Sequence, residues 1–445
     1  MAMAHRAPSG LQDGRAEYET GGYKWYVAGV LCLAHMVAMV DRFVMVLVSE
    51  PVRAALHLTD TQLGLLQGTD FSLLYCGFAI PLGAIADATN RRNLILFGLA
   101  VWSVATIMAA TATSFGGLFA ARILVGMGEA CLIPAGMSLL TTYFAPANLA
   151  RGTAVFGMGA NFGLGLAFLG GGIVLAALQA RGGLAVPGLG PVQPWQGVFL
   201  LAGLLAVPVL VLLCWLKEPP RARSAGGFAA ARAGLGYLLG NLKGYAPFLG
   251  LAAMTAVTGY TLNSWSSSLF VRVHGMTAAE AGKMIGLVGL LAGPLGTIGG
   301  GVVLDRMRAK GVAGAPLLVM AGGSVVALLT AAGIGHAPSL PVAILLFCLF
   351  MVESTFTLPS IYAGMQLLTP PAFRGVAASF NMMIYTLAGL GIGPAAVGAI
   401  SDRLRGPRAL ADAIVLVEAA MALLIVPIAL VARQAYQRRV AALAG

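Results

Sequence analysis

Charged residues are scarce in this chain. Asp, Glu, Lys and Arg make up 10% of its 445 residues, and 59% are hydrophobic, whereas soluble globular proteins carry about 25% charged residues. This composition excludes an ordinary soluble domain. No segment alternates apolar and polar residues over the length of a strand, which argues against a membrane β-barrel.

Patterns that would indicate an enzyme or a metal protein are also absent. The five cysteines stand singly inside apolar segments, and an odd number without paired spacing argues against disulfides and metal sites. The glycine runs 170–172 and 299–301 lack the lysine that a phosphate-binding loop requires. No nucleophile lies in a pattern with a base. We therefore expect neither catalysis nor a cofactor. Residues 1–23 lack the apolar core of a cleaved signal peptide.

Long apolar runs fill almost the whole chain. Each is long enough to cross about 30 Å of hydrocarbon as a helix. Glycine, present 60 times, favours close packing of helices in membranes. We predict an all-α membrane protein with twelve transmembrane helices, at about 25–48, 61–86, 94–115, 117–142, 152–178, 196–216, 246–270, 281–304, 315–335, 341–365, 376–399 and 411–433.

One sequence pattern occurs twice. Thr59, Gly64, Gly83 and Asp87 recur 218 residues later, as Thr277, Gly282, Gly301 and Asp305. Glu129 and Arg151 have counterparts 224 and 223 residues later, in Glu353 and Arg374. Internal repeats of this kind are typical of transporters that place the substrate path between related halves. We therefore expect two pseudo-symmetric bundles of six helices each.

The basic residues indicate how the chain lies in the membrane. The net charge is +11, and most Lys and Arg fall in segments on the side of both termini. This bias places the termini in the cytoplasm, so we expect a multi-pass protein of the cytoplasmic membrane, surrounded by lipid. Because the positive-inside bias accounts for the charge, we expect no nucleic-acid partner, and we expect a monomer. The predicted segments are a tail 1–23, a bundle 24–216, a basic cytoplasmic linker 217–245, a bundle 246–434 and a tail 435–445.

The linker allows two interpretations. Its apolar residues, which include Phe228, Leu235 and Leu238, fit a helix lying on the inner membrane surface. The interpretation that we favour is a flexible linker near anionic lipid.

Two matched loops end the second and eighth spans. An aspartate at the C-terminal end of a helix opposes the helix dipole and needs a partner outside that helix. Two copies at the same offset indicate a role in conformational switching. The residues are Gly83, Asp87, Arg91 and Arg92 in the first loop, and Gly301, Asp305 and Arg306 in the second.

These loops resemble the signature of the major facilitator superfamily, although Ala88 stands where that loop usually carries arginine. The N-terminal half further resembles the spinster family, through Asp41-Arg42-Phe43, Gly64-Leu-Leu-Gln67, Asn90-Arg91-Arg92 and Gly126-Met-Gly128-Glu129. The resemblance implies two bundles that rock about a central cavity faced by the first and fourth spans. It also implies lysophospholipid or sphingoid-phosphate-like substrates.

Ionisable residues inside the spans are the main candidates for function. Each costs at least about 2.5–3.5 kcal/mol on insertion scales unless it is paired or working. Asp41 and Arg42 are adjacent in the first span, and Arg122 and Glu129 lie seven apart in the fourth. We expect two neighbouring acid–base pairs, with Asp41 and Glu129 as proton-coupling groups. Arg42 and Arg122 would bind anions or exchange partners, because arginine keeps its proton. The alternative is a static pair that holds two helices together.

The second half offers fewer candidates. Glu353 repeats the position of Glu129 but has no arginine in its own bundle, so it is either a substrate-binding or proton-carrying acid or a satisfied buried acid. Asn263 and Asn381 offer hydrogen bonds to a polar head group, although such residues more often join helices. Asp70 and Glu418 are weaker candidates, because they are compatible with positions at the membrane interface.

These residues predict a secondary transporter that moves an amphipathic or anionic small molecule by alternating access, driven by a proton gradient. Lysophospholipids or sphingoid-phosphate-like lipids are the substrates that the resemblance implies. A water-soluble organic anion or drug-like compound is the alternative on the same fold. A sensor or channel that does not transport is less favoured, because the tails are too short for a signalling domain.

Overall fold

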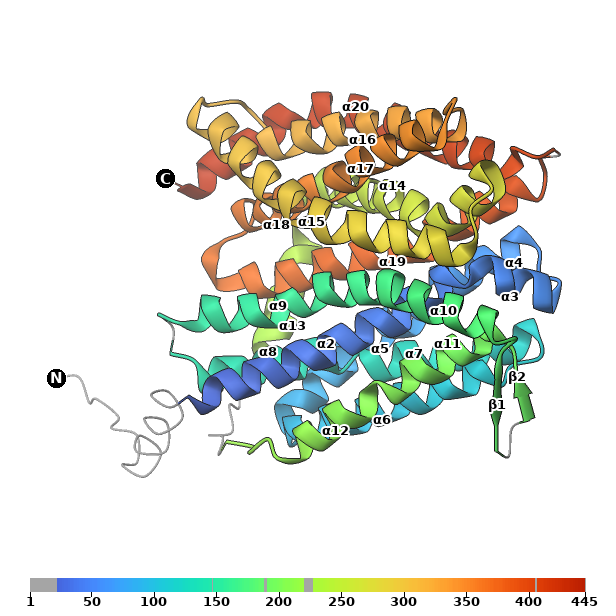
Figure 1. Ribbon diagram of the computed structural model, residues 1–445. Helices are drawn as coiled ribbons and strands as arrows, with labels where there is room; N and C mark the ends of the chain where they lie inside the picture. The colour runs from blue at the N-terminus through green and yellow to red at the C-terminus, as the bar shows by residue number, and fades with distance from the viewer. Residues whose placement is uncertain (1–21, 146, 188–189, 220–226, 405, 445) are drawn as a thin grey trace.

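The computed structural model describes residues 22–145, 147–187, 190–219, 227–404 and 406–444. Helices run side by side along one direction, with the N-terminal half of the chain in one layer and the C-terminal half in the other (Figure 1). Helix α2 begins, and helix α20 ends, at the same end of this stack, which we call the terminal end. We call the opposite end the distal end.

The N-terminal half contains the following elements: α2 (Tyr23–Leu47), α3 (Ser49–Leu56), α4 (Asp60–Gly64), the π-helical turn η1 (Leu65–Thr69), α5 (Asp70–Ala88), α6 (Arg91–Ala110), α7 (Phe115–Glu129), α8 (Leu132–Tyr143), α9 (Leu149–Gly165), the π-helical turn η2 (Leu166–Gly170), α10 (Gly171–Ala180), strands β1 (Leu184–Val186) and β2 (Gly190–Val192), α11 (Pro194–Leu204) and α12 (Ala206–Cys214). The two strands form an antiparallel hairpin at the distal end.

The C-terminal half follows the connecting helix α13 (Gly227–Gly240). Its elements are α14 (Leu242–His274), α15 (Ala278–Ala309), α16 (Ala315–Gly335), α17 (Leu340–Phe356), α18 (Leu358–Leu367), the short 3-10 turn η3 (Pro371–Phe373), α19 (Arg374–Ser401) and α20 (Ala409–Ala444). Helix α14 ends at His274 and is capped by Gly275, whose φ of 69° lies in the left-handed region that favours glycine.

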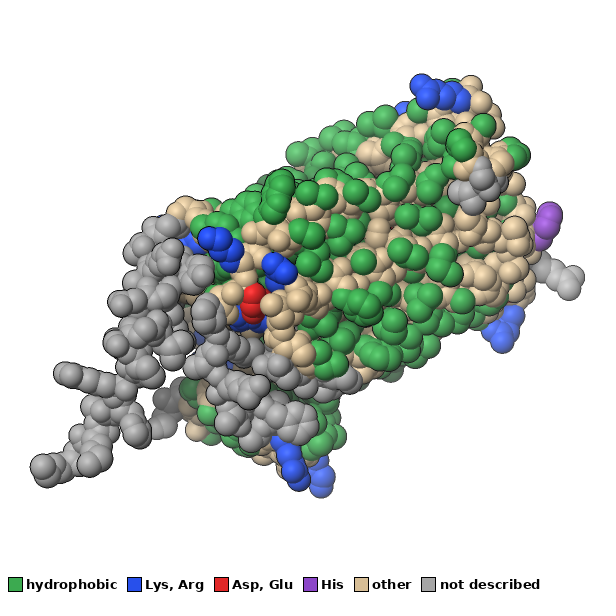
Figure 2. Space-filling view, turned by 90° about the horizontal axis from the view of Figure 1, so that it is seen from below, with side chains coloured by type: hydrophobic (Ala, Val, Ile, Leu, Met, Phe, Trp, Pro, Cys, Tyr) green, Lys and Arg blue, Asp and Glu red, His purple; other side chains and the backbone are tan. Residues whose placement is uncertain are grey.

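Helices occupy all twelve predicted spans. Within the described residues, ten helices are long and apolar enough to cross a membrane. The other two predicted spans coincide with α4–η1–α5, which a π-helical turn interrupts, and with α14, whose polar Thr, Ser and Asn side chains lower its mean hydropathy. Hydrophobic side chains cover the middle of the face shown in Figure 2, and Lys and Arg gather toward its edges. The all-α membrane fold is therefore confirmed.

The predicted repeat appears in the structure as two matched helix starts. The Thr59 hydroxyl accepts a hydrogen bond from the amide of Gln62, and the Gln62 side chain accepts one from the amide of Thr59. Thr277 and Glu280 form the same reciprocal pair at the start of α15. This arrangement satisfies two amides that a helix start leaves free, so the repeated threonines fix where α4 and α15 begin.

The favoured interpretation of the linker is wrong for residues 227–240, which form α13. Leu238 is buried, and the Tyr237 ring stacks on Phe373 with centroids 4.6 Å apart. Gly234 lies against Val376 at the start of α19. Because one face of α13 is packed against the C-terminal half, this segment is ordered as a helix rather than a flexible connection.

Glycines let the two halves approach closely near the distal end. A Cβ atom on Gly64 would lie 2.4 Å from the Pro394 carbonyl oxygen of α19, and one on Gly68 would lie 2.4 Å from that of Leu390. Gly286 of α15 meets the Leu169 amide of η2 in the same way. No side chain fits between these backbones, so glycines bring α4 and η1 close to α19, and η2 close to α15.

We expect Gly64→Ala to open the distal end, because the new methyl group would collide with backbone that cannot move aside. Ser268, which is buried there against Ser49, reports the change when it is replaced by cysteine in a cysteine-free background. Its labelling by an impermeant maleimide should rise more than about tenfold as the population shifts. Gly77→Ala on α5 is the matched control, because a Cβ atom at Gly77 meets nothing within 4 Å. Equal labelling in both variants would contradict the assignment.

Candidate functional site

Five ionisable side chains converge inside the N-terminal half. Asp41 and Arg42 lie on α2, Asp70 begins α5, and Arg122 and Glu129 lie on α7. The four other than Arg42 are buried. Buried charges are expensive in a membrane and mark candidate functional sites.

Arg42 and Glu129 form a direct ion pair. The Arg42 Nη2 donates to Glu129 Oε2 at 2.8 Å, and the two side chains are 13% and 1% exposed. The guanidinium also lies over the Phe71 ring, 4.2 Å from its centroid, and near the Tyr75 ring at 5.5 Å. Stacking on an aromatic face holds a guanidinium in place while leaving its edges free to donate. Arg42 is thus held by Glu129 and by two aromatic rings, and its side chain stays partly exposed.

A local break in the fourth span positions Glu129. Helix α7 ends at Glu129 and α8 begins at Leu132, two residues before Pro134. The matching break separates α17, which ends at Phe356 three residues after Glu353, from α18, and Pro359 lies in the first turn of α18. Proline has no backbone N–H to donate a helical hydrogen bond. The shared spacing of Glu and Pro therefore places each acid in the last turn of a helix.

Arg122 pairs with an acid of the second span. Its Nε lies 3.4 Å from Asp70 Oδ2, and its Nη1 donates to the Asp41 carbonyl at 2.8 Å. Both side chains are almost completely buried. The sequence analysis had ranked Asp70 among the weaker candidates, and the structure places it in the central cluster. The sequence signal that could have identified Asp70 was Arg122, because a buried guanidinium needs a carboxylate partner.

Of the two expected acid–base pairs, the structure forms one between Arg42 and Glu129, whereas Arg122 pairs with Asp70 rather than with Asp41. Adjacent residues on a helix point about 100° apart, so Asp41 and Arg42 face different neighbours. Arg122 and Glu129 share a face but lie about 10 Å apart along the axis, beyond direct contact. The arginines are shared across helices instead: α2 with α7, and α7 with α5.

The Asp41 carboxylate is buried without a counter-ion of its own. Its side chain is inaccessible to solvent, and neither oxygen accepts a hydrogen bond from the described residues. Trp102 and Thr106 of α6 lie beside it. A buried carboxylate without hydrogen bonds is costly, which makes Asp41 a candidate functional group.

Two acids are buried in the C-terminal half. Glu353 of α17 lies against Gly323 of α16, where an added Cβ atom would meet its Oε1 at 2.6 Å. Glu418 of α20 is completely buried. Glu353 Oε2 and both carboxylate oxygens of Glu418 find no hydrogen-bond partner among the described residues. Glu353 therefore packs toward α16, and it is not a fully satisfied acid.

The two predicted amides differ in their surroundings. Asn381 is buried, and its Nδ2 donates to the Ile361 carbonyl at 3.4 Å, which joins α19 to α18. Asn263 is partly exposed, but its Oδ1 is buried without a hydrogen-bond partner in the described structure. Tyr260 and Tyr385 lie edge to face with centroids 6.0 Å apart, and Tyr260 is close enough to Arg42 to interact with its charge. Tyr260 of α14 thus lies between the arginine of α2 and Tyr385 of α19.

The predicted switch loops lie at the terminal end. Arg91 Nε donates to Glu218 Oε1 at 2.7 Å, and the Arg92 amide donates to Glu218 Oε2 at 3.0 Å. Gly83 closes the second span within α5, and the side chain of Asp87 lies outside the described residues. In the second loop Asp305 and Arg306 are exposed, and Gly301 has open space beside it. Glu218, just after α12, was missed as the partner of the first loop.

A polar network joins the two halves at the distal end. Arg272 at the end of α14 donates to both carboxylate oxygens of Asp60 at 2.8 Å and to Glu50 at 2.9 Å. Ser401 donates to Asp60, and Asp402 accepts from the amides of Asp60 and Thr61. With the glycine contacts, these bonds close the distal end.

This distal network makes stability depend on pH. Burial alone would raise the pKa of Asp60, but hydrogen bonds from Arg272 and Ser401 outweigh it and hold the pKa below its usual value. Burial would also raise the pKa of Asp402, but the hydrogen bonds from Thr61 outweigh burial, and the pKa of Asp402 is lowered. Because both pKa values fall on folding, the stabilisation is present above about pH 4 and is lost as pH falls below it.

We expect the melting temperature of the wild type in detergent to fall more steeply from pH 5 to pH 3 than that of Asp60→Asn. Asp412→Asn, an exposed acid, should follow the wild type, and three parallel profiles would contradict the prediction.

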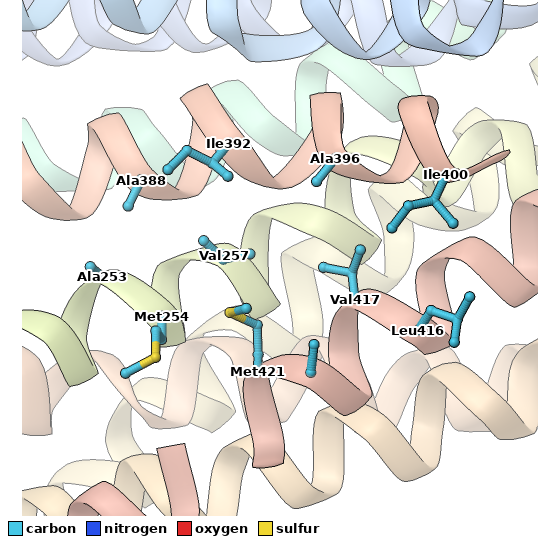
Figure 3. Close-up of a pocket in the computed structure, with 11 residues that line it drawn as sticks. Ala253, Met254, Val257, Ala388, Ile392, Ala396, Ile400, Leu416, Val417 and Met421 are labelled. Atoms are coloured by element: carbon cyan, nitrogen blue, oxygen red, sulfur yellow. The ribbon is translucent and has the colours of Figure 1, made fainter. Parts of the chain in front are cut away.

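A separate apolar groove of about 390 Å³ lies between α14, α19 and α20 (Figure 3). Its walls include Met254, Ile392 and Leu416, and it contains no charged side chain. Ile392 and Leu416 are more than half and half exposed, respectively. This groove is suited to contact with lipid tails, and it is separate from the charged cluster.

Comparison with known proteins decides the family. The sequence profile of the Major Facilitator Superfamily matches residues 31–394. The chain belongs to the major facilitator superfamily. As a member of this superfamily the protein is a membrane transporter and not an enzyme.

Relatives of this superfamily member include spinster proteins and an efflux pump. It is 26% identical over 414 residues to an MFS-type efflux pump of Mycolicibacterium smegmatis, which covers 90% of each chain. It is 26% identical over 426 residues to human protein spinster homolog 1, which covers 89% of this chain and 75% of the relative. A bacterial homolog of the human lysosomal transporter spinster, solved in an inward-facing and unoccupied conformation, has a TM-score of 0.77 and 24% identity, and the match covers 96% of this chain and 98% of that one. The predicted major facilitator fold and the resemblance to spinster proteins are confirmed.

Proposed function

We propose that the protein couples a proton gradient to the movement of an amphipathic anion, of the lysophospholipid or sphingoid-phosphate class. The observation that carries this proposal is the Arg42–Glu129 pair, in which a stacked guanidinium is 13% exposed and its carboxylate partner is buried. A phosphate group offers the oxygens that a guanidinium fork prefers. An anionic head group would therefore compete with Glu129 for Arg42.

This competition links substrate to protons. When the substrate anion takes Arg42, Glu129 is left buried without its cation, and it gains a proton to become neutral. When the substrate leaves, Glu129 returns to Arg42 and the proton departs. Binding of the anion and uptake of one proton thus occur together. Beside this exchange, the Arg122–Asp70 pair joins α7 to α5, and Asp41 of α2 lies buried without a counter-ion of its own.

The two bundles supply the alternation. Contacts between them at the distal end close that side, and the predicted orientation places the distal end outside the cell. The structure would then represent the state that is closed to the outside. Opening requires Arg272 to leave Asp60 and Glu50, and the two glycine contacts to separate. The protein would act as a monomer in the cytoplasmic membrane with both termini inside.

A water-soluble anion or drug-like compound is the second candidate. It is favoured by the similarity to an efflux pump along 90% of both chains and by the buried, unpartnered Oδ1 of Asn263. Such a substrate would meet the same arginine but would not need an apolar wall for a tail.

Proteoliposomes with a trapped pH dye test both candidates. Sphingosine phosphate, lysophosphatidylglycerol, a short-chain alkyl phosphate and a cationic dye are added in turn at equal concentration. We expect proton movement with the two long-chain lipids and little with the others. Movement with the short-chain anion or the dye alone would favour the second candidate. No proton movement with any substrate that is shown to be transported would overturn the coupling.

A further inference from the structure

A second groove, of about 920 Å³, lies at the terminal end of the C-terminal half, far along the chain from the cluster on α2 and α7. We call it the basic groove. It lies between the starts of α14 and α16 and the last turns of α20, and its lining includes Lys243, Phe248, Leu317, Val431, Arg438 and Arg439. Nothing in the proposed transport cycle uses it.

The walls of the basic groove divide by polarity. Phe248, Leu317 and Val431 contribute an apolar surface, and Val431 is 82% exposed. Lys243 stands in the first turn of α14, and Arg438 and Arg439 stand in the last turns of α20. The apolar part therefore lies toward the middle of the helices and the cations toward their ends, as the tail and head of a lipid require.

The cations of the basic groove have no carboxylate partner among the described residues. In the part of the chain that the structure describes, Lys243, Arg438 and Arg439 form no ion pair with a carboxylate. The Arg439 guanidinium lies over the Tyr245 ring, 4.4 Å from its centroid, which orders it without neutralising it. Helices α14 and α16 also begin here, and helix starts attract anions. Three cations and two helix starts thus surround one groove.

We propose that the basic groove binds a diacyl anionic phospholipid of the surrounding leaflet as a resident ligand, and not as a transported one. Its phosphate would lie among Lys243, Arg438 and Arg439, and its acyl chains along Phe248 and Val431. Basic pockets between helices on the cytoplasmic side suit such head groups, and the predicted orientation places this end there. Because the ligand bridges α14, α16 and α20, it stabilises the C-terminal bundle.

Native mass spectrometry of the purified full-length protein tests this site. Phosphatidylglycerol and phosphatidylcholine with identical acyl chains are titrated in detergent, and retained lipid is counted. We expect the wild type to prefer phosphatidylglycerol. Lys243→Gln/Arg439→Gln should weaken that lipid about 25-fold, at about fivefold for each cation near the head group, and should leave phosphatidylcholine unchanged. Arg151→Gln/Lys310→Gln removes the same charge from two exposed positions and should stay within about twofold of the wild type.

Further variants keep the proposal open to refutation if the double variant folds poorly. Ala435→Trp fills the groove without changing its charge and should also displace phosphatidylglycerol. Equal retention of both lipids by the wild type, or equal loss in both double variants, would show only a general charge effect and would overturn the proposal. Equal stabilisation by glycerol phosphate, or a dimer that the groove variants abolish, would assign the groove to a soluble anion or to a second copy instead. None of these outcomes depends on transport, so the site and the proposed function fail separately.

Discussion

Glu129→Gln will remove the pH dependence of substrate binding while leaving the fold intact. Glutamine has the size of glutamate and still accepts a hydrogen bond from Arg42, but it cannot gain and lose a proton. In the wild type one proton is taken up with each anion, so affinity should change about tenfold per pH unit where Glu129 titrates. In the variant Arg42 keeps its charge without a competing carboxylate, and anion affinity should be high at every pH.

Tryptophan fluorescence titrations with an anionic lysolipid at pH 6, 7 and 8 measure this slope. The same variant in proteoliposomes should exchange substrate across the membrane but fail to accumulate it against a gradient. Asp412→Asn, which changes an exposed carboxylate, should keep the wild-type slope. A wild-type slope in Glu129→Gln would move the proton to Asp41 or Asp70 and would reduce Glu129 to a static partner.

Arg122→Met should be the most destabilising single change in the N-terminal half. It leaves Asp70 buried without its cation, and removal of one partner from a buried pair costs about 3–5 kcal/mol. The double variant Asp70→Leu/Arg122→Met replaces the pair with apolar side chains of similar size. We expect it to recover most of the stability, because apolar replacements of buried pairs are often neutral or better.

Melting temperatures in detergent, measured for each single variant and for the pair, show whether the two changes are additive or coupled. Arg151→Met changes an exposed arginine near the start of α9 and should shift stability by no more than about 0.5 kcal/mol. If Arg122→Met and Arg151→Met have the same melting temperature, the Arg122–Asp70 pair is not a stabilising contact. If the double variant remains as unstable as the single one, Arg122 acts through the Asp41 carbonyl instead.

The fold could be predicted from the sequence because it depends on patterns that are visible along the chain. Apolar length defines the spans, and the repeated Thr59 and Thr277 mark equivalent helix starts that the structure confirms. Side-chain partners depend on three dimensions. Spacing along α7 placed Arg122 and Glu129 on one face, but only packing against α2 and α5 shows that each turns to a different helix. The helical state of residues 227–240 likewise depends on contacts with α19 that lie far along the chain.

The candidate site was predicted in part for the same reason. Asp41, Arg42, Arg122 and Glu129 stand out because charge inside an apolar run is unusual wherever the helix is directed. Asp70 lies near the start of its run, so its sequence position alone is compatible with the interface. Glu353 matches Glu129 by position, yet the structure turns it toward α16, because Gly323 leaves room there and no arginine attracts it elsewhere.

The glycine contacts between the halves have a consequence for speed. Where Gly64 meets Pro394 and Gly286 meets Leu169, main chain packs directly on main chain, so no side chain has to change rotamer for these two contacts to separate. These contacts should therefore add little to the barrier for separating the two halves. The slow step of each turnover should therefore be the breaking of the Arg272 bonds and the handover of Arg42 between acid and cargo. The turnover rate should consequently respond more to salt and pH than to the bulk of nearby apolar side chains.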